Sequence, residues 1–132
     1  MKVHESAENY LETILILSQK NGNVRSIDIA NELAFSKPSV SVAMKNLRTQ
    51  GHIVVDNDGY IRLTESGRKI AETIYERHTL ISNWLVHLGV PAEIAAEDAC
   101  RMEHVISPES FHAIKAHLNS EEHIKALSNQ NK

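Results

Sequence analysis

The chain of 132 residues has a single cysteine, few aromatic residues and no long apolar segment. One cysteine cannot form a disulfide within the chain, which fits a reducing compartment, so we expect a cytoplasmic protein. No apolar run approaches the ~18 residues of a membrane span, so we expect neither a transmembrane helix nor a signal peptide. Aromatic residues make up 5%, too few for a protein that binds single-stranded nucleic acid by stacking on its bases.

The net charge of −3 is spread unevenly along the sequence. Residues 36–50 contain no acid and three bases, which are Lys37, Lys45 and Arg48. Residues 91–109 contain five acids and a single base. The first segment suits phosphate groups and the second suits cations, so the average charge does not exclude binding to DNA.

The first half of the chain predicts three helices followed by a β-hairpin. Apolar residues at helical spacing predict helices over residues 6–20, 26–34 and 38–50. Ser26 is the expected N-cap of the second helix, which should bury Ile27, Ala30 and Leu33. Pro38 is tolerated in the first turn of the third helix.

The helical spacing of apolar residues ends where the hairpin is predicted. Two β-branched segments, residues 52–55 and 60–63, are separated by Asp56-Asn57-Asp58-Gly59, a turn sequence typical of hairpins. Short helices joined by a tight break and followed by a hairpin describe a winged helix-turn-helix. The predicted fold class is therefore mostly α with a small β-hairpin wing.

The second half predicts helices only. Thr64 can cap a long helix, Pro91 opens another to about Ile106, and Ser107 precedes a helix through Leu118. A last short helix is expected over residues 120–127. This half is too thin to form a globule alone, so we expect its long apolar stripe, with Trp84 and Leu85, to pack against the first half and a second copy of the chain.

The third helix presents a polar face opposite its apolar one. In a helix-turn-helix, the N-terminal end of this helix enters the major groove. Hydroxyl and basic groups there can bond phosphates or base edges, and Pro38 or Val42 can contact a thymine methyl group. The predicted DNA-binding residues are Ser36, Lys37, Pro38, Ser39, Ser41, Val42, Lys45 and Arg48. The alternative is a merely solvated face, but the hairpin behind this helix favours DNA binding.

Cys100, Glu103 and His104 are spaced i, i+3 and i+4, so they project from one face of a helix. A thiolate, a carboxylate and an imidazole together suit first-row transition metals. Asn9 and Glu12 on the first helix and His78 on the apolar stripe are further donors, and six would converge if the three helices meet. The alternatives are that Cys100 and His78 are core residues, or that Cys100 and His104 form a nucleophilic pair.

Several motifs together resemble the diphtheria toxin repressor family, over nearly the whole chain. They are Glu8-Asn-Tyr-Leu-Glu12, Ser36-Lys-Pro-Ser-Val40, Leu63-Thr-Glu-Ser-Gly67, Arg77-His78 and Ala99-Cys-Arg-Met-Glu-His104. Members of this family are dimeric winged-helix repressors that bind palindromic operators once loaded with Fe²⁺ or Mn²⁺. The resemblance implies the same function here, without the SH3-like third domain of the longer members.

The resemblance also implies a hybrid set of metal ligands. Cys100, Glu103 and His104 match the iron-sensing branch, whereas Glu12 and His78 match the manganese-sensing branch. The manganese branch has an aspartate in place of Asn9 and a glutamate in place of Cys100. Zn²⁺, Co²⁺ or Ni²⁺ are expected to bind in vitro.

These features together predict a metal-activated repressor of metal-ion homeostasis, which is not an enzyme. Residues 1–72 are expected to bind DNA, and residues 73–132 to form a helical domain for metal binding and dimerisation. The resemblance implies that a divalent ion relieves repulsion between Glu12 and Glu103 and ties the first helix to the dimer helices.

Three alternatives stay open at this point. A repressor answering a small organic ligand would need a roomy apolar pocket. A metalloenzyme would need an open coordination position beside a general base. A metal-independent interaction module would have no operator.

Overall fold

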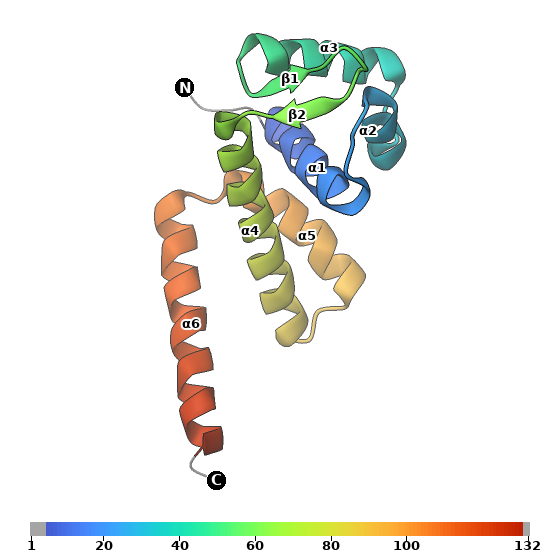
Figure 1. The fold of residues 1–132 in the computed structure, drawn as a ribbon. Helices are drawn as coiled ribbons and strands as arrows, with labels where there is room; N and C mark the ends of the chain where they lie inside the picture. The colour runs from blue at the N-terminus through green and yellow to red at the C-terminus, as the bar shows by residue number, and fades with distance from the viewer. Residues whose placement is uncertain (1–4, 131–132) are drawn as a thin grey trace. The chain divides into compact units, whose positions relative to one another are not determined.

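The computed structural model describes residues 5–130, with the side chains of residues 6–120, and its elements are labelled in Figure 1. In chain order the elements are α1 (Glu5–Asn21), α2 (Ser26–Leu33), α3 (Lys37–Thr49), β1 (Ile53–Val55), β2 (Ile61–Leu63), α4 (Glu65–His87), α5 (Ala92–Val105) and α6 (Pro108–Gln130). Three helices, a hairpin and then helices alone confirm the predicted fold class. The chain divides into two units between Glu76 and Arg77, inside α4. The domain limits at residues 72 and 73 stay predictions.

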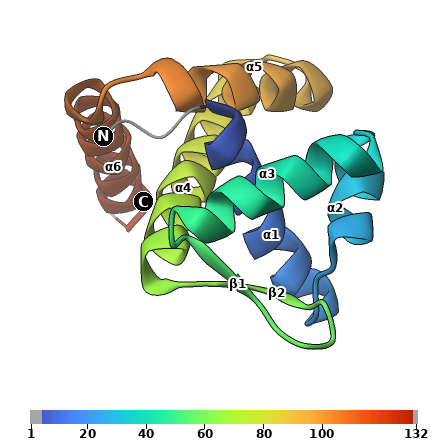
Figure 2. The ribbon, with the colours of Figure 1, turned by 90° about the horizontal axis from the view of Figure 1, so that it is seen from above.

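The first unit has an apolar core to which its helices and both strands contribute. Leu11, Ile14 and Leu15, which helical spacing places on one face of α1, are all buried. The core also contains Val24, Ile29, Ala30, Val40, Met44, Leu47, Ile53 and Ile61. Figure 2 shows α3 crossing α1 with the hairpin beside them. Burial of one face of each element therefore fixes the position of α3 within this unit.

The N-cap of the second helix, α2, lies one residue earlier than predicted. Arg25, not Ser26, is the N-cap, because the carboxylate of Asp28 accepts the Arg25 backbone N–H at 2.9 Å. The buried isoleucine also differs: Ile29 is fully buried, whereas Ile27 is 39% exposed. The spacing of Ile27 alone did not distinguish the inner face of α2 from its edge.

The third helix, α3, begins at Lys37, one residue before the predicted start. The hydroxyl of Ser36 caps it by accepting the backbone N–H of Ser39 at 3.3 Å. Pro38 lies in the first turn, where its missing N–H costs no helical hydrogen bond. Val40, Met44 and Leu47 are buried, so the other face of α3 is left to solvent.

The hairpin forms the predicted wing. Its antiparallel register pairs Ile53 with Leu63, Val54 with Arg62 and Val55 with Ile61. Ile53 and Ile61 are buried against the helices, whereas Val54 and Arg62 are exposed. In the turn, the side chain of Asp56 accepts the backbone N–H groups of Asp58 and Tyr60, both at 2.9 Å.

The start of α4 packs closely against the residues that precede β1. Thr64 donates its hydroxyl hydrogen to the carbonyl of Gly51 at 2.7 Å and accepts the N–H of Gly67 at 3.3 Å, which confirms it as a cap. A Cβ atom on Gly67 would overlap the backbone carbonyl of His52. Glycine is therefore required here by the approach of two backbones.

The second unit contains the rest of α4 with α5 and α6. The hydroxyl of Ser107 caps α6 by accepting the N–H of Ser110 at 3.1 Å, as the sequence predicts. The predicted break between residues 118 and 120 is wrong, because α6 is one helix. Asn119 and Ser120 disfavour a helix only weakly, and neither glycine nor proline stands there to end it.

No helix within residues 5–130 combines the length and the apolar character that crossing a membrane requires.

We predict that Gly67→Ala lowers the free energy of unfolding by about 1–3 kcal/mol, because the new methyl group must displace the His52 carbonyl. Alanine replacing glycine in an open helix position would instead stabilise by about 1 kcal/mol. Urea unfolding measures the difference. Lys69→Ala, at an exposed position of the same helix, is the control. An increase in stability for Gly67→Ala would contradict the close backbone approach.

Candidate metal centre and nucleic-acid interface

Cys100, Glu103 and His104 come together on α5 as their spacing predicts. Their sulfur, oxygen and nitrogen donor atoms lie within 4.8 Å of one another. The small residues Ala95 and Ala99 are fully buried on the same helix, which lets the backbone of α5 approach its neighbours. Donor atoms this close, of three different kinds, form a set that a single transition-metal ion can bind.

The carboxylate of Glu103 is the most buried part of this cluster. Its side chain is fully buried, and its Oε2 lies 2.9 Å from Nδ1 of His78 on α4. Its Oε1 lies 3.3 Å from Nε2 of His104 but accepts no hydrogen bond from any described residue. A buried carboxylate oxygen without a donor is costly, and a cation held by the same imidazoles would satisfy it. The residues present therefore fit a divalent metal.

The interpretation of Cys100 as a core residue does not hold, whereas that of His78 stays open. Cys100 is exposed, so it is not a packed core residue of an alanine-rich helix. His78 is half-buried, and its Nδ1 lies 2.9 Å from the Glu103 carboxylate, an arrangement that suits a hydrogen-bonded core histidine as well as a metal ligand.

Asn9 and Glu12 belong to α1 in the first unit. Both follow the helical spacing expected of them, and Glu12 is buried. The hydroxyl of Thr13 donates to the backbone carbonyl of Asn9 at 2.8 Å, which leaves the Asn9 side chain unused by that bond. Their part in metal binding stays a prediction from the resemblance.

Arg77 is a residue of this site to which the sequence assigned no role. Its guanidinium donates to the backbone carbonyls of Glu103 and Ile106 at 3.1 and 3.0 Å. The adjacent His78 was recognisable from its place on the apolar stripe, whereas an arginine in a helix usually indicates only a solvated position. Arg77 and Glu103 are 26 positions apart in the sequence, and the periodicity of apolar residues cannot predict a contact over that separation.

All eight predicted DNA-binding residues lie on exposed positions at or near α3. They are Ser36, Lys37, Pro38, Ser39, Ser41, Val42, Lys45 and Arg48. The hydroxyls of Ser36 and Ser39 bond each other at 2.8 Å, which fixes both at the N-terminus of the helix. Val42 is 61% exposed although it is apolar. An exposed valine between serines and lysines is suited to a base methyl group.

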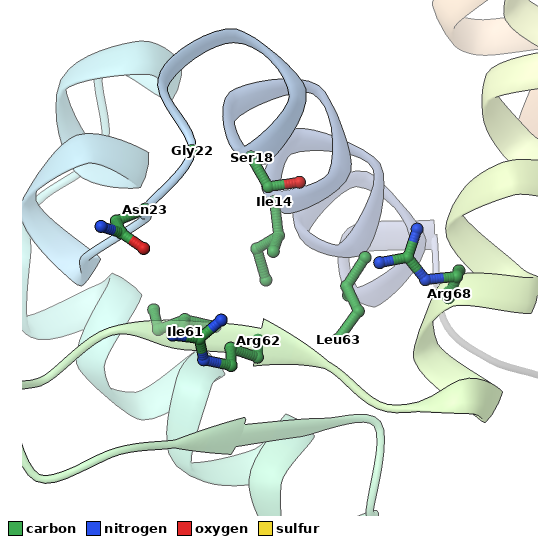
Figure 3. A pocket seen from close by; sticks show the side chains of 8 residues that line it. All are labelled: Ile14, Ser18, Gly22, Asn23, Ile61, Arg62, Leu63 and Arg68. Atoms are coloured by element: carbon green, nitrogen blue, oxygen red, sulfur yellow. The ribbon is translucent and has the colours of Figure 1, made fainter.

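A pocket of about 360 Å³ lies between the end of α1, β2 and the first turns of α4 (Figure 3). Ile14, Ile61 and Leu63 line one part of it, and the guanidinium groups of Arg62 and Arg68 line another. It is therefore not the roomy apolar pocket that a repressor answering an organic ligand would need.

Comparison with known proteins decides the family. The sequence profile of the N-terminal DNA binding domain of iron dependent repressors matches residues 2–60, and that of their metal binding and dimerisation domain matches residues 64–125. The transcriptional regulator MntR of Escherichia coli O6:H1 is 38% identical over 111 residues, which are 84% of this chain and 72% of that protein. The chain belongs to the iron-dependent repressor family.

Other members agree with this assignment. The iron-dependent repressor IdeR of Mycobacterium tuberculosis is 32% identical over 117 residues, covering 88% of this chain and 51% of that protein. The structure of the manganese regulator SloR superposes with a TM-score of 0.76 at 30% identity, covering 86% of this chain and 53% of that one. The chain thus spans about half the length of IdeR and of the solved SloR chain.

Family membership confirms the resemblance to the diphtheria toxin repressor. As a member of this family, the chain is a metal-dependent DNA-binding transcription regulator and not an enzyme. The interpretation of Cys100 and His104 as a nucleophilic pair is therefore wrong, as is the metalloenzyme alternative. The family's metal-binding domain, residues 64–125, contains the whole cluster around Glu103.

We predict that Lys45→Ala and Arg48→Ala weaken binding to all duplex sequences, because both side chains are exposed on α3 and suited to phosphate contacts. Each substitution should reduce the slope of log affinity against log salt by about 1. Ser39→Ala and Val42→Ala should instead alter the preference among sequences. Fluorescence anisotropy over a range of salt concentrations measures both effects.

Lys20→Ala is the matched control, since Lys20 is an exposed lysine on α1. Unchanged affinity of the Lys45 and Arg48 double variant at about 150 mM salt would show that α3 does not contact the DNA.

Proposed function

We propose that this chain represses transcription by binding operator DNA when a divalent first-row metal occupies the centre around Glu103. The observation that carries the proposal is the buried Glu103 carboxylate, flanked by the imidazoles of His78 and His104, with Cys100 one turn away on the same helix face. These four side chains are the proposed ligands in the second unit. Asn9 and Glu12 are kept as predicted ligands from the resemblance alone.

When bound, the metal supplies two positive charges to a site that already holds a buried carboxylate. The residues of the chain do the rest: Glu103 orients the imidazole of His78 and lies beside that of His104, and Cys100 offers a thiolate at the exposed side of the cluster. Since the metal acts only through its preference for the DNA-competent arrangement, a hundredfold preference corresponds to about 2.7 kcal/mol. By linkage, operator DNA must raise the metal affinity by the same factor.

The proposed partners are double-stranded operator DNA and a second copy of the chain. A dimer whose two α3 helices enter successive major grooves needs a spacing of about 34–36 Å and reads a palindrome. Trp84 and Leu85 on α4 are half-buried and are the proposed centre of the dimer seam. Sedimentation should therefore give twice the 14.8 kDa chain mass, with or without metal. The proposed compartment is the cytoplasm, where Cys100 stays reduced.

The choice of metal follows from the mixed donor set. Manganese is named for the SloR relative and iron for IdeR. Mn²⁺ prefers carboxylate and carbonyl oxygen, whereas thiolate favours metals later in the divalent series. Cys100 beside His104 should therefore bias this chain toward Fe²⁺, and in vitro toward Co²⁺, Ni²⁺ or Zn²⁺, over Mn²⁺. The carboxylate of Glu103 acts in the opposite direction, so Mn²⁺ activation is retained.

The proposed function is tested by selecting duplexes from a random pool in anaerobic buffer with Fe²⁺ or Mn²⁺, and by repeating the selection with a chelator. We expect enrichment of a palindromic sequence with metal and none without it. Equal enrichment with the chelator would favour the metal-independent alternative. No enrichment under either condition would contradict DNA binding itself.

We predict that Cys100→Ala raises the concentration of every metal needed for half-maximal DNA binding, because the thiolate is a ligand. Cys100→Glu should instead favour Mn²⁺ relative to Fe²⁺, since it replaces a soft donor with a hard one. Anaerobic anisotropy titrations of the selected duplex measure both midpoints. Asp98→Ala, at an exposed acid of α5, is the control. Identical midpoints for the wild type and Cys100→Ala would remove Cys100 from the ligand set.

A further inference from the structure

Arg77 joins two helices at the metal centre through one nitrogen. It is the residue before His78 on α4, and its Nη1 donates to the backbone carbonyl of Glu103 at 3.1 Å and to that of Ile106 at 3.0 Å. The first of these contacts therefore links two parts of the proposed ligand set, because Arg77 precedes His78 and Glu103 is itself a proposed ligand. All of these residues belong to the second unit.

The carbonyls that Arg77 contacts are at the end of α5. This helix ends at Val105, and Ile106 follows in an extended conformation with φ −76° and ψ 137°. The last carbonyls of a helix lack amide partners within the helix, and they carry its negative dipole end. A guanidinium satisfies both needs, since it is a permanent cation with several donors. Arg77 thus caps the C-terminus of α5, the helix that carries three of the proposed metal ligands.

The same guanidinium contacts α6. Its Cζ atom lies 5.4 Å from the ring centroid of Phe111, which is buried in the first turns of α6. A planar guanidinium stacks on an aromatic ring in a way that an ammonium does not reproduce. Arg77 is consequently held in one orientation by α5 and α6 together, and it is not free to swing away from the Glu103 carbonyl.

We propose that Arg77 is a positioning residue of the metal centre. It fixes the backbone of Glu103 relative to His78, so that the carboxylate and the two imidazoles are arranged before metal arrives. The inference rests on the proposed function of the cluster. Groups that orient metal ligands in this way typically change metal affinity by about 10–100-fold when they are removed.

Electrostatic repulsion alone predicts the opposite change in metal affinity when Arg77 is replaced. Arg77 carries a positive charge near a site for a cation, so removing that charge should tighten metal binding by Coulomb's law. Positioning predicts weaker binding from the same substitution. The direction of the change therefore separates the two effects.

The experiment is an anaerobic titration of the whole protein with Co²⁺, followed by the visible bands of bound cobalt and by the thiolate-to-cobalt charge-transfer band of Cys100. Arg77→Met removes the charge and the hydrogen bonds, and Arg77→Lys keeps the charge but loses the planar group. Arg101→Met is the matched control, because Arg101 is exposed on α5 beside Cys100. Thermal unfolding of each metal-free variant is measured in parallel.

We expect Arg77→Met to bind Co²⁺ about 10–100-fold more weakly, with altered cobalt bands, and Arg77→Lys to fall between it and the wild type. Arg101→Met should bind as tightly as the wild type or slightly more tightly. Where Arg77→Met does not fold, Arg77→Lys decides by the same comparison.

Equal or tighter Co²⁺ binding by the folded Arg77 variants would overturn the inference, even if their thermal midpoints fell. Absence of Co²⁺ binding by the wild type would be a different result. It would contradict the proposed function and with it the premise of this inference.

Discussion

The second unit depends on one buried charge, the carboxylate of Glu103. Burying an ion costs on the order of several kcal/mol unless partners compensate it. Here His78 on α4 is the hydrogen-bond partner of one carboxylate oxygen, whereas the oxygen that lies 3.3 Å from His104 accepts no hydrogen bond from a described residue, so the compensation is incomplete without a further partner. Arg77 then fixes the end of α5 from the same turn of α4. The residues that surround this costly buried charge are therefore the same residues that form the candidate metal centre.

The first unit is organised by a different constraint, the burial of one face of each short helix. The cap at Ser36 and the buried Val40 and Leu47 orient α3 without any contribution from a metal ligand on that helix. A metal is thus not needed to form the exposed face of α3 that is predicted to contact DNA. The proposed effect of the metal is a change in the population of DNA-competent arrangements and not the folding of α3. Its size is therefore given by the ratio of the metal affinities of the DNA-competent and the other arrangements.

The sequence predicted what periodicity and short-range chemistry determine. The order of elements, the caps at Thr64 and Ser107 and the exposed face of α3 follow from local patterns. Burial of Ile29 rather than Ile27, the exposure of Cys100 and the contact of Arg77 with Glu103 do not. Those three depend on which neighbouring element covers a helix face, and a contact across 26 residues leaves no trace in a helical period.

The four donors of the second unit are not equivalent, because they differ in burial. Cys100, a proposed ligand, is exposed, so its substitution is expected to disturb the packing of the second unit little. His78 is the hydrogen-bond partner of the fully buried Glu103 carboxylate. Its removal would therefore leave that carboxylate without its hydrogen bond and destabilise the folded chain even when no metal is bound. The thiolate can therefore determine metal preference nearly independently of stability, whereas the imidazole of His78 couples the two. Variation in metal specificity is accordingly expected at position 100 and not at position 103.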